Sequence, residues 1–324
     1  MRYLEWDPAR PEQKLPPFGA LPEGVHVFNR EPVDAVNAAL AARRPLLVRG
    51  EPGTGKSQLA RAAAAGLGRP LVATAIDGST EARDLLWSLD AVSRLAEAQI
   101  QGALGVRDSA AVRANLREER FLAPGPLWWA FDWADAARQA AETGQFAPPT
   151  PEGWSPADGV VVLLDEIDKA DSSVPNGLLE CLGHGRFACP GGRSVCTQPG
   201  QAAPLIVLTT NEERALPAAF LRRCLVLQLG WPQEPEELVG ALVRWGRAHF
   251  PAHAPAVLDR AARRLAADRQ ALLDRDLVPP GGAEYLDLLR ALGELAPGHE
   301  EGQLELLERL AVFTFAKHAA EPAG

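Results

Sequence analysis

One stretch constrains the fold more than any other, because it has the order of a strand, a glycine-rich loop and a helix. The apolar residues 45–48 lead into Gly50-Glu-Pro-Gly53-Thr-Gly55-Lys56-Ser57, and helix-forming residues follow from 58 to 65. This is the pattern Gly-x-x-x-x-Gly-Lys-Ser in the context that it requires. A chance glycine turn would not need both flanking elements. The sequence therefore predicts an α/β fold built around a phosphate-binding loop.

The loop residues have separate expected tasks. Glycines let the backbone bend so that several N–H groups point at phosphate oxygens, and the following helix adds the positive end of its dipole. Lys56 is expected to reach the β- and γ-phosphates, and the Ser57 hydroxyl to bind Mg²⁺. The predicted nucleotide-binding residues are Gly50, Glu51, Pro52, Gly53, Thr54, Gly55, Lys56 and Ser57.

A second pattern adds hydrolysis to binding. Residues 160–164 are all apolar and are followed by Asp165 and Glu166, which is typical of a strand buried on both faces. Asp165 is expected to hold Mg²⁺ through water, and Glu166 to orient and polarise the attacking water. The alternative is a buried strand that merely ends in solvated acids. Beside a complete phosphate loop, the catalytic interpretation is favoured.

Composition limits the class of protein. The chain has 324 residues, so we expect one large domain and a second, smaller one. No apolar run reaches membrane-spanning length, and the first residues lack a signal-peptide pattern, so we expect a cytoplasmic protein without membrane contact. The net charge of −9 argues against direct nucleic-acid binding as the main task. The net charge does not exclude a local basic patch inside a pore.

Four cysteines lie in the second half of the chain. With His184, they give the spacing Cys-x₂-His-x₄-Cys-x₆-Cys over residues 181–196, with Cys224 further on. A zinc site needs a clean Cys-x₂-Cys or comparable pair, which this spacing lacks. Reduced thiols in a cytosolic chain fit better.

The rest of the chain divides by composition. Residues 1–23 are rich in proline and predict an extended arm, 24–231 an α/β nucleotide-binding domain with an insertion at about 81–158, and 232–324 a helical domain. Residues 81–116 are helical in composition, and 185–197 predict a β-hairpin. Val27 and Phe28 are candidates for a base pocket or plain core. Four tryptophans of the insertion face a partner or, as is commoner, bury an extra helix: Trp128, Trp129, Trp133 and Trp154.

Helices are predicted in the last domain at 235–250, 255–273, 283–295 and 303–319.

With a phosphate loop, a buried strand ending in Asp-Glu and this helical domain, the chain resembles the AAA+ ATPases. The stretches 164–170, Leu-Asp-Glu-Ile-Asp-Lys-Ala, and 211–224, Asn-Glu-Glu-Arg-Ala-Leu-Pro-Ala-Ala-Phe-Leu-Arg-Arg-Cys, resemble the MoxR-type branch in particular. The resemblance covers about residues 24–320. It implies a P-loop NTPase fold, a parallel-sheet sandwich with a C-terminal helical lid.

The resemblance also implies roles for polar residues near the sheet. Asn211 falls on the sensor-1 position, where it would contact the attacking water or the γ-phosphate; capping a turn is its alternative role. Arg223 falls on the arginine-finger position, offered to the neighbouring subunit, and the adjacent Arg222 is the other candidate. The family's sensor-2 arginine is absent from residues 279–286. Another arginine of the lid, such as Arg290, would have to replace it.

The function implied by the resemblance is ATP hydrolysis with Mg²⁺ in a ring, a hexamer, that remodels a partner protein. A von Willebrand factor A domain protein is the partner type of such relatives, and this chain contains no such domain. One alternative is the motor subunit of a restriction or anti-phage complex, which could use GTP. Another is a nucleotide-dependent switch without turnover, which the presence of Glu166 and the two arginines disfavours.

Overall fold

The computed structural model describes residues 2–104 and 108–315, which fall into two compact units. The first contains residues 2–6, 30–49 and the described part of 60–227. The second contains residues 7–29, 50–59 and 228–315. The phosphate loop therefore groups with the C-terminal helices, although the strand before it belongs to the first unit.

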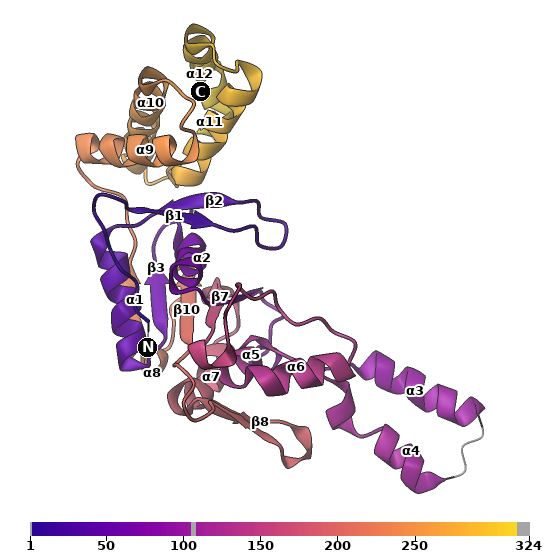
Figure 1. Ribbon diagram of the computed structural model, residues 1–324. Helices are drawn as coiled ribbons and strands as arrows, with labels where there is room; N and C mark the ends of the chain where they lie inside the picture. Colours follow the sequence, from indigo (N-terminus) through magenta and orange to yellow (C-terminus); the bar gives the residue numbers. More distant parts are fainter. Residues whose placement is uncertain (1, 105–107, 316–324) are drawn as a thin grey trace. The chain divides into compact units, whose positions relative to one another are not determined.

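The first unit is built on a five-stranded sheet in the order β11-β3-β10-β7-β4 (Figure 1). Strand β10 pairs in parallel with β3 and with β7, and β4 pairs in parallel with β7. The bounds are β3 Leu46–Arg49, β4 Leu71–Ala75, β7 Val161–Asp165, β10 Leu205–Thr210 and β11 Leu225–Gln228. Because the central strands are parallel, the carboxyl ends of β7 and β10 lie at one edge of the sheet. The predicted α/β class and parallel sheet are confirmed.

Strands β7 and β10 are buried on both faces, as their unbroken apolar runs predicted. Val162 and Ile206 belong to one hydrophobic core, and the neighbouring residues Val161 and Leu205 are buried as well. Helix α1 (Arg30–Ala42) packs on β3 and β10, and α5 (Pro126–Phe131) on β4 and β7. Parallel sheets are covered by helices in this way because the crossovers between their strands are helical.

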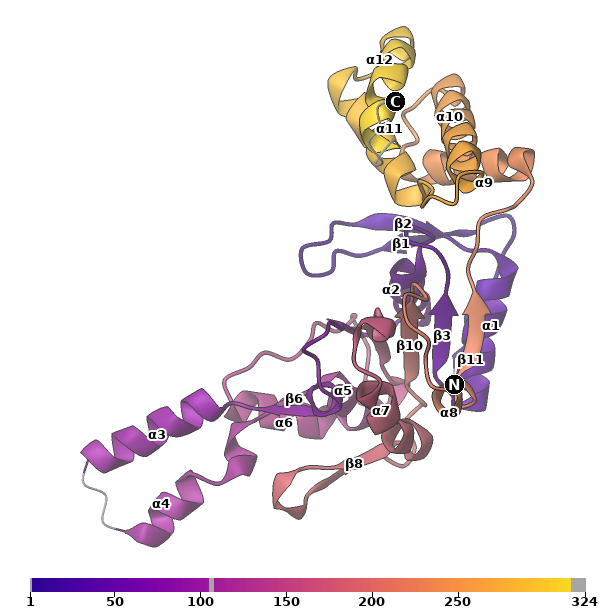
Figure 2. The same cartoon turned by 180° about the vertical axis from the view of Figure 1, so that it is seen from behind.

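The remaining helices before residue 228 include α2, which begins at the phosphate loop. They are α2 Lys56–Leu67, α3 Ala91–Ala103, α4 Ser109–Asn115, α6 Trp133–Glu142, α7 Ser173–His184 and α8 Ala218–Leu221. Figure 2 shows α3 and α4 extending away from the sheet. The predicted hairpin is present as β8 (Arg186–Ala188) paired with β9 (Ser194–Cys196).

The insertion differs from its helical prediction in one segment. Strand β5 (Trp87–Leu89) pairs antiparallel with β6 (Leu122–Pro124) and lies inside the stretch that was expected to be helical. The partner strand follows only after α3 and α4, so local composition carries no sign of the pairing. Tertiary pairing overrides intrinsic propensity here.

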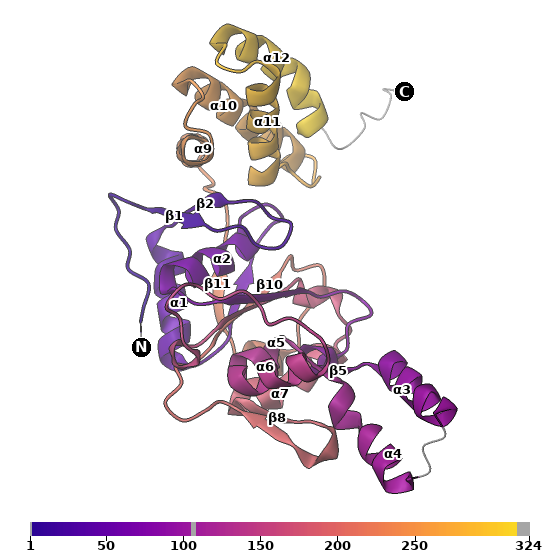
Figure 3. The same ribbon diagram turned by 45° about the vertical axis from the view of Figure 1, so that its right-hand side comes forward.

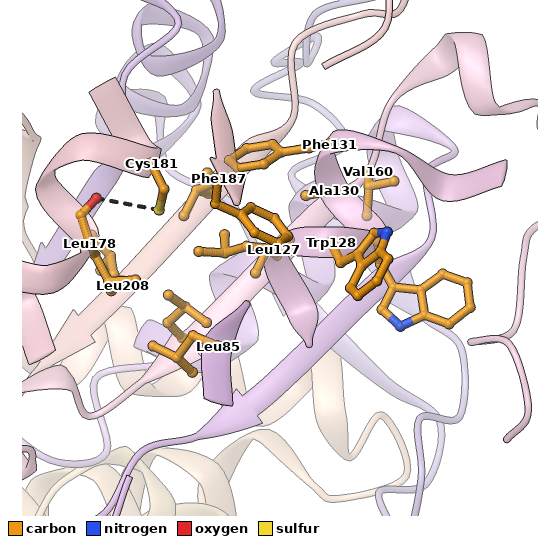
Figure 4. Packing of buried hydrophobic residues seen from close by; sticks show 14 of the residues in the cluster. Leu85, Leu127, Trp128, Ala130, Phe131, Val160, Leu178, Cys181, Phe187 and Leu208 are labelled. Carbon is orange, nitrogen blue, oxygen red and sulfur yellow. Dashed lines mark hydrogen bonds between the residues drawn. The ribbon is translucent and has the colours of Figure 1, made fainter. Parts of the chain in front are cut away.

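The tryptophans of the insertion serve mainly as core. Trp128, Trp129 and Trp133 are all buried, and Trp133 contacts Trp154 edge to face with ring centroids 4.7 Å apart. Figure 4 shows Trp128 in a cluster with Phe131 and Phe187. Of the two uses left open by the sequence, burial of an extra helix is the one observed for these three residues.

The described part of the second unit combines a hairpin with the helices α9 to α12 (Figure 3). Strand β1 (Glu12–Leu15) pairs antiparallel with β2 (Gly24–Val27), so the arm contains a strand where proline-rich composition predicted none. The helices are α9 Pro235–His249, α10 Pro255–Leu273, α11 Gly282–Leu295 and α12 Glu300–Thr314. They match the four predicted helices, although residues 316–319 of the last prediction lie outside the described residues. In the described part of the chain, no helix is both long and apolar enough to cross a membrane.

Candidate functional site

The phosphate loop adopts a backbone that its glycines make possible. Gly53 and Gly55 have φ values of 76° and 89°, in the left-handed region that disfavours other residues. Gly50 is required for a further reason, since a Cβ atom there would lie 2.0 Å from the carbonyl oxygen of Leu229. Helix α2 then begins at Lys56. Glycine is thus needed at Gly53 and Gly55 for their backbone angles, and at Gly50 also for the close approach of Leu229.

Lys56 is a buried cation folded back onto its own loop. Its side-chain Nζ donates to the carbonyl oxygens of Gly50 at 2.7 Å and Glu51 at 2.8 Å. The Thr54 hydroxyl donates to the Glu51 carbonyl at 2.9 Å. A buried ammonium at the start of a helix suits an anionic ligand. The chemistry of this loop therefore fits the phosphates of a nucleotide, and the Ser57 hydroxyl next to Lys56 is a ligand type that Mg²⁺ accepts.

Asp165 is the last residue of β7 in the first unit and Glu166 follows it, and β10 brings polar groups beside both. The Thr209 hydroxyl donates to a carboxylate oxygen of Asp165 and accepts the backbone N–H of Glu166 at 2.8 Å. The Asn211 amide donates to Glu166 Oε1 at 3.2 Å. Asn211 thus lies against the predicted base. The sequence analysis did not single out Thr209. Its only signal in the sequence was a hydroxyl side chain near the end of an apolar strand.

Glu166 has an unusual backbone conformation. Its φ and ψ are 62° and 50°, which is the left-handed helical region and costs a non-glycine residue of order 1–3 kcal/mol. Its other carboxylate oxygen, Oε2, accepts from Lys169 Nζ at 2.6 Å, and this hydrogen bond raises the pKa of Lys169. The carboxylate is therefore held by an amide on one side and an ammonium on the other. Such outliers concentrate at functional sites.

Arg222 and Arg223 lie at the end of the short helix α8, and both are exposed. The Arg223 guanidinium donates to the Ala219 carbonyl of its own helix at 3.2 Å. A third arginine fixes the backbone of residues 222–224. Arg44 donates to the carbonyl oxygens of Arg222, Arg223 and Cys224. Arg44 was missed by sequence reasoning because it lies almost 180 positions away. The arrangement presents two guanidinium groups on a fixed backbone.

The second unit contains a group of buried polar atoms that lack hydrogen-bond partners. Within residues 2–104 and 108–315, this is true of His26 Nδ1, Gln58 Oε1, Trp231 Nε1 and His249 Nε2. Gln58 follows the phosphate loop directly, and Trp245 contacts both Trp231 and His249 edge to face, with centroids 5.5 and 5.7 Å apart. Buried donors and acceptors without a partner are uncommon in folded proteins. Val27 and Phe28, the sequence candidates, follow His26 directly.

His26 gives a pH-dependent prediction. Its pKa is lowered from 6.5 to about 4, chiefly by burial and also by the nearby His249, while the side chain of Gln58 opposes the shift. A histidine with a depressed folded-state pKa stabilises the fold above its unfolded pKa of about 6.5 and loses that stability as the pH falls toward 4. We expect the free energy of unfolding to fall by about 2 kcal/mol between pH 8 and pH 5 from this group. Urea denaturation of wild type and His26→Gln at both pH values measures it; an equal pH dependence in the two proteins contradicts it.

The helical domain offers an arginine other than the one expected. Arg290 is exposed and pairs with Asp287 on its own helix at 2.9 Å. Arg269, near the end of α10, instead donates to Glu51 of the phosphate loop at 2.6 Å. Arg269 lies ahead of the turn at 279–282, and nothing in the sequence around it indicates a contact with the phosphate loop. The lid arginine that contacts the loop in this structure is therefore Arg269.

Three of the four cysteines are buried thiols. Burial raises the pKa of Cys181 to about 12 and the pKa values of Cys189 and Cys224 to about 11. Among the residues that the structure describes, no group of three or more His, Cys, Asp or Glu side chains could hold a metal ion. Protonated, buried thiols of this kind are chemically inert.

The chain is similar to a known family over a part that contains the phosphate loop and the two carboxylates. Residues 45–224 match the family model described as the AAA domain of the dynein-related subfamily. No curated protein matches the chain. Among solved structures, the chain is similar to a mutant of RuvB from Thermotoga maritima, with 16% sequence identity, a TM-score of 0.46, and coverage of 87% of this chain and 69% of that chain.

Proposed function

We propose, from the premise that the chain belongs to the dynein-related subfamily of AAA domains, that it hydrolyses ATP with Mg²⁺ in a ring of identical subunits. The observation that supports turnover rather than binding alone is the left-handed Glu166, whose carboxylate is held by Asn211 and Lys169. A strained, positioned carboxylate after a buried strand is what a water-activating residue needs.

The residues of the chain divide the chemistry between them. Lys56 and the loop N–H groups hold the phosphates, and Ser57 with Asp165 would hold Mg²⁺, which neutralises charge that develops on the phosphates. Thr209 fixes the Asp165 carboxylate and the Glu166 backbone. Glu166 accepts a proton from the attacking water, and Asn211 orients both. Arg223, or Arg222, acts on the nucleotide of the next subunit.

The biological role is the second part of the proposal. We propose the MoxR-type branch, on the motif residues 164–170 and 211–224 together with the α3–α4 insertion and the β8–β9 hairpin. A hexamer that remodels a von Willebrand factor A domain protein or another client in the cytoplasm follows from that proposal. We also propose the domain boundaries: an arm at 1–23, a nucleotide-binding domain at 24–231 and a lid at 232–324. A GTP-using motor of a defence complex is the second candidate, and turnover of GTP distinguishes it.

Removing the Lys56 ammonium should abolish nucleotide binding. Lys56→Ala takes the one, buried, lysine from a loop that must hold several negative charges, and no other side chain of residues 50–57 supplies a cation. Isothermal titration with ATP and GTP measures the loss, and turnover of both nucleotides with Mg²⁺ tests the proposed reaction. Lys14→Ala, which changes an exposed lysine on β1, is the control and should bind as wild type. Undiminished ATP affinity in Lys56→Ala would overturn the phosphate-loop assignment.

A further inference from the structure

The phosphate loop carries a carboxylate that works against its proposed ligand. Residues 50–57 contain one acid, Glu51, and one base, Lys56, so the loop has no net side-chain charge. A triphosphate brings several negative charges to this loop. Glu284, on α11, adds a second carboxylate nearby, since a Cβ atom on Gly281 would lie 3.6 Å from Glu284 Oε2 and 3.7 Å from the Gly53 Cα. Without a further cation, the carboxylates of Glu51 and Glu284 would repel the phosphates that Lys56 attracts.

Arg269 supplies that cation from the helical domain, within the same unit as the loop. Its side chain is only 7% exposed, and Nη2 donates to Glu51 Oε2 at 2.6 Å. Nη1 donates to the Pro280 carbonyl at 3.2 Å, just before α11 begins. Arg269 therefore ties the end of α10 and the start of α11 to the loop. The Arg269 side chain is buried, whereas the Glu51 side chain is 47% exposed. An ion pair with one buried partner is screened less than a fully exposed pair.

Glu51 connects Arg269, which its side chain contacts, to Lys56, which its main chain contacts. Its main-chain carbonyl accepts from Lys56 Nζ at 2.8 Å and from the Thr54 hydroxyl at 2.9 Å. On the other side, Gly53 packs against α11, since a Cβ there would lie 3.4 Å from the Ala283 nitrogen. One residue thus joins the lysine by its backbone and the lid arginine by its side chain.

We propose that Arg269 is a positioning residue for nucleotide binding: it neutralises Glu51 and so converts a loop without net charge into a cationic one attached to the helical domain. The proposal rests on the nucleotide-binding function proposed above. It predicts a particular sign of coupling. Arg269 is needed because Glu51 is there, so removing Glu51 should lessen the need for Arg269.

A double-mutant cycle on ADP affinity tests this coupling. Arg269→Gln leaves a bare carboxylate beside the phosphates and should weaken ADP binding roughly 10- to 100-fold, the range typical of coupling between sites. Adding Glu51→Gln should restore at least about tenfold of that loss. The KM for ATP should rise more than kcat falls, whereas a purely structural defect would lower the active fraction and leave KM unchanged. Equal effects of Glu51→Gln in both backgrounds would contradict the proposal.

Controls separate the possible failures. Arg290→Gln and Asp287→Asn remove an exposed lid pair of the same chemistry and should show no coupling in ADP affinity. If Arg269→Gln does not fold, Arg269→Lys keeps the charge but loses the fork, and Glu51→Gln should lessen its smaller defect in the same way. No ADP or ATP binding by wild type contradicts the proposed function itself. Wild-type binding with an additive cycle contradicts only the role of Arg269.

Discussion

Replacing Arg223 with alanine should lower ATP turnover roughly 10³- to 10⁵-fold, the range for arginine fingers in phosphoryl transfer. The side chain is exposed at the end of α8, and it donates to the Ala219 carbonyl of its own helix. Its loss should therefore leave each subunit folded and able to bind ATP. Steady-state hydrolysis and ATP titration measure the two properties separately. Arg113→Ala is a matched control, since Arg113 is also exposed and donates to the carbonyl four residues earlier, at 3.2 Å.

Mixed rings test whether the arginine acts on a neighbour. Arg223→Ala and Lys56→Ala subunits each keep one half of an interface, so some boundaries in a mixture join an intact loop to an intact arginine. Activity should reappear although both parents are inactive. Arg222→Ala in the same experiment decides which of the two arginines acts. If mixed rings form and nothing is restored, the arginine does not act in trans. A protein that stays monomeric with every nucleotide favours the switch alternative.

Arg44 explains why the backbone of this segment should persist in the variants. Its guanidinium spans three consecutive carbonyl oxygens, those of Arg222, Arg223 and Cys224. None of these contacts uses the Arg222 or Arg223 side chain. Alanine at either position therefore removes a guanidinium without releasing the segment that carries it.

The second large effect is expected at Glu166. Glu166→Gln should keep ATP bound while turnover falls by roughly 10²–10⁴, the usual contribution of a positioned base. The amide is isosteric, so the contact with Asn211 can persist, but it cannot take a proton from water. Single-turnover hydrolysis and ATP titration provide the measurement. Glu180→Gln, which changes an exposed acid on α7, is the control. Hydrolysis at the wild-type rate in Glu166→Gln would place the water-activating group elsewhere.

The Glu166→Gln variant also offers the most direct route to the client. A ring that binds ATP without turning it over should hold its partner longer, so capture with this variant is more informative than with wild type. A von Willebrand factor A domain protein among the captured chains supports the MoxR-type proposal. A nuclease subunit together with a preference for GTP in turnover supports the defence-complex alternative.

Local sequence was sufficient where one short segment carries all the necessary information. The glycines at 50, 53 and 55 have the backbone angles or close contacts that only glycine tolerates; the motif specifies the first and the last, and the same stretch supplies the third. The apolar runs of β7 and β10 are long enough to predict burial on both faces. The four helices of the second unit were predictable because proline and glycine mark their boundaries.

Tertiary structure decided what depends on residues far apart in the chain. Thr209 meets Asp165 only because β10 lies beside β7, and Arg44 reaches the end of α8 only because the strand that follows it borders β11. Strands β1 and β5 exist through pairing rather than propensity.

The lid arginine shows the same division. Residues 279–286 contain no arginine, yet a buried one, Arg269, reaches the loop from α10. Sequence determined the fold class and the phosphate loop because their constraints are local. Only the fold could show which cation compensates Glu51, because opposite charges attract across space without regard to their separation along the chain.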